Sequence, residues 1–146
     1  MIPEADRSRL SVLLPEALEK YYREGIRVFL SGGALGFDTL AAEAVLRLRE
    51  RHPEIRLIMA VPCRSQSSRW SPEDRRVYQN LLTKADEVRV ISEEYYPGCM
   101  QKRNLFLVSH AGICLCYLKH CRGGTWNTVS SAYDRGLTIE NLALKL

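Results

Sequence analysis

The chain has 146 residues, of which 46% are hydrophobic and 26% charged, and 21 basic against 17 acidic residues give a formal net charge of +4. This apolar content excludes a disordered chain and is sufficient for one globular domain over residues 1–146. The small positive charge permits a phosphate-bearing partner, but no long basic run marks a nucleic-acid-binding arm.

The sequence also predicts the compartment. It has no stretch near the roughly 18 apolar residues of a membrane helix, and its first residues lack the layout of a signal peptide. We therefore expect a cytoplasmic protein with no membrane partner. The five cysteines are an odd number in a chain of this length, which favours reduced thiols. Neither a C-x-x-C nor an H-x-x-x-H pair is present, so we expect no metal site.

Short β-branched segments alternate along the chain with segments of helical periodicity. In the first helical segment, Pro15 marks a kink or a later start. The third begins at an N-cap, Ser71, which Pro72 follows. Helices are expected over residues 10–25, 37–51, from 71 onward, 99–110 and 125–135, and strands over 26–31, 56–61, 87–91, 112–118 and 138–142.

This alternation predicts an α/β protein, with three α/β/α layers and an open, mostly parallel sheet. Ligands bind such sheets at the carboxyl ends of the strands. One of these ends carries SGGALGFD (residues 31–38). Its glycines let a ligand approach the backbone, and the following helix offers free N–H groups to an anion. A tight turn without a ligand is the alternative.

The same turn argues against common nucleotide sites. It lacks the Gly-Lys-Ser/Thr ending of a P-loop and matches only two glycines of G-x-G-x-x-G. The next strand ends in Pro62, Cys63 and Arg64, with no acid to hold a ribose. We therefore expect no NAD site and no other cofactor.

A second glycine turn, RGGTWNT (residues 122–128), follows the fourth expected strand. Two such turns at one edge of a sheet can converge on a single phosphate or ribose. Thr125 and Thr128 have hydroxyl groups that either bind a ligand or cap the helix. Arg103, next to Asn104, is either a bidentate phosphate donor or a solvated surface residue.

Taken together, these segments resemble a known family. SGGALGFD, AVPCRSQSSRW (residues 60–70), CMQKRN (99–104), RGGTWNT and SSAYDRGLTIENL (130–142) resemble the YpsA-like branch of the SLOG superfamily. That superfamily also contains the DprA/Smf proteins and the LOG (lysine-decarboxylase-like) phosphoribohydrolases. The resemblance covers approximately residues 10–142. It implies a Rossmann-like fold whose glycine turns bind a nucleotide or nucleotide-derived ligand.

The resemblance also implies a set of ligand-binding residues. Gln66 is suited to bind a base edge, and Trp70 either stacks on a base or is a buried structural residue. The complete set is Gly32, Gly33, Gly36 and Asp38 of the first turn, Pro62, Gln66 and Trp70 of the next loop, Arg103 with Asn104, and Gly123, Gly124, Thr125 and Thr128 of the second turn.

The chain departs from its relatives in three respects, one of which is Ser109, where relatives commonly carry an aspartate. LOG hydrolases have a glutamate in the second glycine motif, and residues 122–131 here contain no carboxylate. The general acid/base for glycosidic cleavage is therefore missing, with Asp38 and Glu43 the only nearby substitutes. Relatives also have a strand ending in a Thr-Gly-His-Arg-like turn ahead of the first helix, and here it is absent. We consider two explanations for its absence. Either the start codon is assigned too late, or another segment or a partner chain fills the place of this strand.

These features favour a nucleotide-binding domain that is non-catalytic or at most weakly catalytic. One alternative is an N-ribosyl hydrolase acting on a nucleoside monophosphate, with Arg103 holding the phosphate. Another is DprA-like binding of single-stranded DNA, which we rank third because the arginines are scattered along helices. We expect a homo-oligomer, because relatives are often oligomeric and a missing strand leaves a sheet edge to cover.

Overall fold

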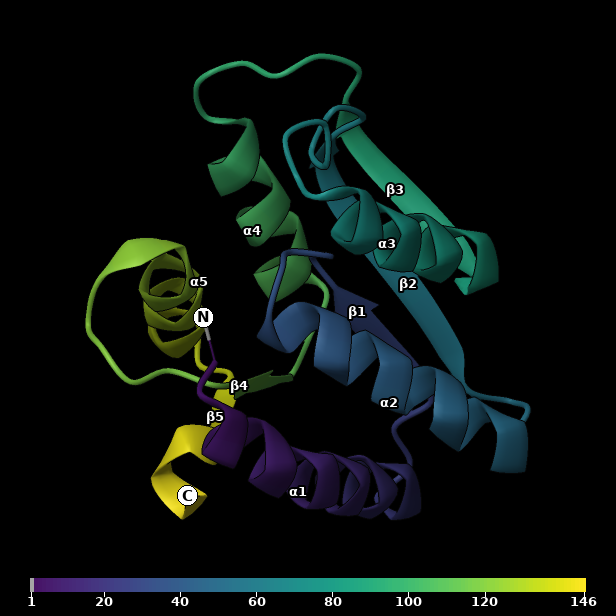
Figure 1. Cartoon of the computed structure of the whole chain (residues 1–146). Helices are drawn as coiled ribbons and strands as arrows, with labels where there is room; N and C mark the ends of the chain where they lie inside the picture. The colour runs from purple at the N-terminus through teal and green to yellow at the C-terminus, as the bar shows by residue number, and fades with distance from the viewer. Residues whose placement is uncertain (1) are drawn as a thin grey trace.

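Helices and strands alternate along residues 2–146, the part of the chain that this computed structural model describes (Figure 1). All strand pairs are parallel, and the α/β fold expected from the sequence is confirmed. The elements are α1 (Glu4–Arg23), β1 (Val28–Ser31), α2 (Phe37–Arg51), β2 (Arg56–Cys63), α3 (Pro72–Lys84), β3 (Glu87–Ser92), α4 (Cys99–Ser109), β4 (Ile113–Cys116), α5 (Gly123–Asp134), β5 (Thr138–Asn141) and a 3₁₀ helix (Leu142–Lys145).

Local sequence accounts for most element boundaries. The Ser71 hydroxyl accepts a hydrogen bond from the Asp74 N–H at 3.1 Å, so α3 begins at its predicted N-cap. By contrast, α1 starts earlier than expected and contains Pro15. Proline removes one helical hydrogen bond. The helix continues through it because Leu14 and Leu18 lie on its buried face on either side.

Within this fold the strands divide into two sheets. One has the order β1-β2-β3, with Leu30 beside Ile58 and Val61 beside Val90. The other is the pair β4-β5. The edge of β1 that faces away from β2 pairs with no strand among residues 2–146, and neither does the edge of β4 that faces away from β5. We expected one open sheet. Instead, no strand among residues 2–146 joins β1 to β4, so the two sheets are not continuous.

Helix α1 connects the two sheets. It packs on α2, which covers β1 and β2. Its Asp6 accepts a hydrogen bond from the hydroxyl of Tyr117 and pairs with Lys119, both just after β4. Near its other end, the Tyr21 hydroxyl donates to Glu140 of β5. The core is therefore shared, and Leu142 of the 3₁₀ helix lies in the same apolar cluster as α1, α2 and β2.

The helices form two layers (Figure 1). Neighbours α1, α2 and α3 pack in sequence, while α4 packs against β2, β3 and α5. No helix in the described part of the chain is long and apolar enough to cross a membrane.

Glu140→Gln should lower the free energy of unfolding by about 2–3 kcal/mol at pH 7 and by less than half of that near pH 3. Burial raises the pKa of Glu140, but hydrogen bonds from Lys145, Tyr21 and Lys20 outweigh it, so the pKa is about 2 against an ordinary value of 4.5. Such a carboxylate contributes its full stability above pH 4.5 and loses it as the pH falls toward 2. Urea unfolding of both proteins between pH 7 and pH 3 measures the difference.

The control for this measurement is Glu50→Gln, at an exposed position of α2. It should change stability by only a few tenths of a kcal/mol at either pH. An equal loss at pH 7 and pH 3 in Glu140→Gln would contradict the electrostatic explanation.

Candidate functional site

The first glycine turn follows β1 and leads into α2. Gly33 and Gly36 have φ angles of +70° and +91°, which side chains rarely adopt. A Cβ added at Gly33 would also lie 3.0 Å from both Met59 Cε and Tyr78 Cε1. Glycine at this position is therefore required both by the backbone and by packing beneath the turn.

Part of the hydrogen-bonding capacity of this turn is used internally. The Gly33 N–H donates to Ser31 Oγ at 3.2 Å, and the Ala34 N–H donates to Asp38 Oδ2 at 3.1 Å. Burial raises the pKa of the Asp38 carboxyl, an effect that the Ala34 N–H and Arg103 oppose. Asp38, a predicted ligand-binding residue, thus stabilises the turn itself.

Arg103 of α4 reaches the underside of the same turn. Its Nη1 donates to the carbonyl of Gly32 at 2.6 Å and lies 3.5 Å from that of Ala60, while its Nε donates to Asn104 Oδ1 at 2.9 Å. The residue is only 6% exposed. Burial lowers the Arg103 pKa and the nearby Asp38 raises it. The guanidinium, which the sequence suggested for phosphate, here holds together the carboxyl ends of β1 and β2.

The loop after β2 also lies against the first turn. Pro62 is fully buried at the end of the strand. Gln66 Nε2 donates to the hydroxyl of Tyr78 at 3.0 Å, and the Trp70 ring meets the Tyr78 ring edge-on with centroids 5.0 Å apart. Tyr78 is a buried residue of α3. Its contacts with Gln66, Trp70 and the Gly33 turn appear only in the folded structure.

The second glycine turn begins α5 and is open. Gly123 has φ of +84°, and no atom beyond its chain neighbours lies within 4 Å of a Cβ added at Gly123 or Gly124. No side chain caps the helix, and its first turn contains no acid. Thr125 is exposed, and the Thr128 hydroxyl donates back to the Gly124 carbonyl at 3.2 Å. Backbone donors at this helix start are therefore available to a ligand.

The structure gathers the predicted site residues into two groups. The first turn, the loop after β2 and the Arg103–Asn104 pair form one cluster at the carboxyl ends of β1 and β2. The second turn follows β4, in the other sheet. No hydrogen bond joins the two turns within residues 2–146.

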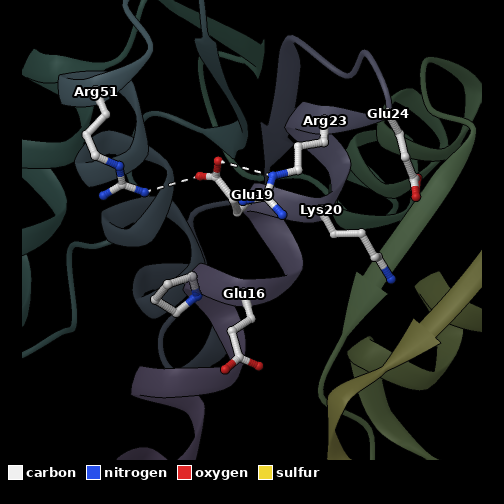
Figure 2. A pocket seen from close by; sticks show the side chains of 7 residues that line it. Glu16, Glu19, Lys20, Arg23, Glu24 and Arg51 are labelled. Atoms are coloured by element: carbon white, nitrogen blue, oxygen red, sulfur yellow. Dashed lines mark hydrogen bonds and ion pairs between the residues drawn. The ribbon is translucent and has the colours of Figure 1, made fainter.

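Another hollow lies elsewhere, on the outer face of α1. Its volume is about 690 Å³, and no predicted site residue lines it. Figure 2 shows that Glu19 pairs with two of the arginines that line it, 3.3 Å from Arg51 and 3.7 Å from Arg23. Because none of the predicted site residues reaches it, we assign this hollow no binding role.

Metal ligation has no support in the described residues. They contain no group of three or more His, Cys, Asp or Glu side chains arranged to hold an ion, and all five cysteines are free.

Comparison with known proteins identifies the family. The YspA SLOG family (YpsA) matches residues 4–135, almost the whole chain. The chain belongs to this SLOG family, in agreement with the resemblance found in its motifs.

Similar individual proteins carry no assigned activity in their names. The chain is 30% identical over 138 residues to the uncharacterized SPbeta prophage-derived protein YoqJ of Bacillus subtilis, a match covering 86% of this chain and 79% of YoqJ. It is 39% identical over 87 residues to a UPF0398 protein of Halalkalibacterium halodurans, covering 58% and 46%. A UPF0398 protein of Brevibacillus brevis is 31% identical over 107 residues, covering 71% and 57%. The chain therefore matches about half the length of these UPF0398 proteins.

Gly32→Ala should destabilise the fold by about 1–3 kcal/mol. The position has no positive φ, but a Cβ there would lie 2.8 Å from Arg103 Nη1 and 3.2 Å from Asp38 Oδ2. The guanidinium must then move and weaken its bond to the Gly32 carbonyl. Chemical unfolding at pH 7 measures the loss.

Gly112→Ala is the matched control, since Gly112 also lacks a positive φ and a Cβ there meets nothing within 4 Å. It should be neutral or stabilise by up to about 1 kcal/mol. Equal effects of the two substitutions would refute a specific role for the Arg103 contact.

Proposed function

We propose that this chain binds a nucleotide or a nucleotide-derived small molecule at the carboxyl ends of its parallel strands. Membership of the SLOG family supports the ligand class. The observation that carries the proposal is that both helices following a glycine turn, α2 and α5, begin without a side-chain cap.

These two helices differ from α3, in which the Ser71 side chain accepts the N–H of Asp74. Helices α1 and α4 also begin without a side-chain cap, but no glycine turn at a strand end of the predicted site precedes them. At the start of α5, Arg122 precedes two glycines, and no side chain competes for the amides. Free amides, the positive end of the helix dipole and close backbone approach together favour an anionic ligand. The second turn is therefore the proposed phosphate subsite.

We further propose that binding is not followed by ribosyl cleavage. Residues 122–131 contain no carboxylate. Asp38 already accepts the Ala34 N–H beneath the first turn, and Glu43 lies further along α2. Both belong to α2, and neither forms a hydrogen bond with a residue of the second turn.

The location and assembly of the protein form the remaining part of this proposal. Five free cysteines suit the reducing cytoplasm. The unpaired edges of β1 and β4 suit association with a second copy, which would cover them.

Gly124→Asp should abolish nucleotide binding while leaving the fold intact. Gly124 has no positive φ and open space around it, and an acid in the first turn of α5 favours the helix by about 0.3–1 kcal/mol. The same negative charge repels a phosphate. Thermal shift with AMP, ADP and ADP-ribose tests binding, and release of ribose 5-phosphate from AMP tests turnover. A ligand at 100 times its dissociation constant adds about 2.7 kcal/mol of stability.

Gly124→Asn is the neutral control of nearly equal size and should retain most of the wild-type shift. Gly33→Asp and Arg103→Ala are unsuitable here, because both disturb buried contacts and would unfold the site. The absence of a shift with every nucleotide, or a shift that survives Gly124→Asp, would refute the proposed subsite. Release of ribose 5-phosphate would overturn the non-catalytic assignment.

A further inference from the structure

A second hollow lies at the carboxyl end of β2, between the following loop and the first turns of α3. Its volume is about 420 Å³. Side chains from the loop and from α3 line it, and no acidic side chain is among them. The residues that matter chemically are Arg64, Ser65, Ser67, Ser68, Arg75 and Arg76, which we call the arginine–serine pocket.

Ser67 is the buried polar residue of this pocket. It is only 6% exposed, and its hydroxyl has no hydrogen-bond partner within residues 2–146. Every fully enclosed side-chain oxygen in the described chain has a partner, so the Ser67 hydroxyl, which has none, keeps some contact with solvent. Ser67 is one of the residues that line the pocket. Buried hydroxyls normally have a partner, and this one is available to a ligand.

The arginines of the pocket have guanidinium N–H groups that no described acidic side chain binds. Arg75 and Arg76 are consecutive exposed residues in the first turns of α3, and neither forms an ion pair with a described residue. Arg64 uses its Nε to bond Glu93, which leaves its two Nη groups. Guanidinium groups in fork geometry match phosphate oxygens, and hydrogen bonds between charged groups are the strong ones.

The pocket is separate from the glycine turns. On the same loop, Gln66 and Trp70 contact Tyr78 and belong to the cluster under the first turn. Neither lines the pocket, nor does any glycine of either turn. At the start of α3, the amide of Asp74 already donates to Ser71 Oγ. The side chains of the pocket therefore carry the recognition.

We propose that the arginine–serine pocket binds the phosphate group of a small phosphomonoester such as a sugar phosphate. The Ser67 hydroxyl donates to one phosphate oxygen, and the arginines neutralise the dianion. A hollow of this volume has the size of a small-molecule site, whereas a nucleic acid strand needs a continuous groove with stacking aromatics. The pocket contains no aromatic side chain among the described residues that line it.

The test is calorimetric titration of the full chain with ribose 5-phosphate at fixed ionic strength. The Gly124→Asp protein is titrated alongside wild type. Because this variant disrupts only the proposed subsite at the second glycine turn, it separates a failure of that proposal from a failure of the arginine–serine pocket. Binding should be saturable in both proteins and absent with unphosphorylated ribose. Arg75→Gln/Arg76→Gln should weaken it at least tenfold, and Ser67→Ala by about three- to tenfold.

Arg7→Gln/Arg47→Gln is the matched control, because it removes two positive charges from exposed positions of α1 and α2. It should change affinity less than twofold. Three results would overturn the proposal: no saturable binding of ribose 5-phosphate, equal weakening by both double variants, or loss of binding in Gly124→Asp. A preference for an oligothymidylate without terminal phosphates, again lost in Arg75→Gln/Arg76→Gln, would also overturn it and indicate a nucleic acid surface.

Discussion

The buried guanidinium of Arg103 is the contact on which the geometry of the carboxyl edge depends. It donates to the carbonyl of Gly32 and approaches that of Ala60, so it links α4 to the ends of β1 and β2. Burying a cation is unfavourable unless it is hydrogen-bonded and near an opposite charge, and Asp38 supplies that charge. The requirement for glycine at position 32 follows, since a Cβ there would meet the guanidinium.

The two glycine turns differ in how far their backbone N–H groups are already hydrogen-bonded. In the first, Asp38 and Ser31 accept backbone N–H groups of the turn, and Arg103 occupies the space beneath it. Its conformation is thereby fixed before any ligand arrives. In the second, glycine is surrounded by open space and the helix start is uncapped. Rigid backbone at one turn and free donors at the other suit a site whose ligand is recognised mainly by backbone groups.

Sequence alone predicted the elements but not their long-range contacts. Apolar periodicity placed the helices and strands, and the Ser71 cap fixed the start of α3, because these signals are local. The direction of the Arg103 side chain depends on a carbonyl 71 residues away, which no local pattern encodes. The proposed role of Ser67 has no local signal for a similar reason. In one short loop, Gln66 contacts Tyr78 while its neighbour Ser67 lines the pocket together with the α3 arginines, and periodicity does not describe such turns.

The division into two sheets changes how the two turns can act together. In a continuous parallel sheet, strand hydrogen bonds fix the spacing of the carboxyl ends, but β1 and β4 share no such ladder here. The spacing must be held by helices. Helix α4 packs against β2 and β3 on one side and against α5, which begins with the second turn, on the other. Because Arg103 anchors α4 to the first turn, the same buried guanidinium contributes to the placement of the second turn, together with the contacts of α1 to β5 and to the residues after β4. The relative position of the two turns therefore depends on side-chain contacts of helices rather than on a shared strand ladder.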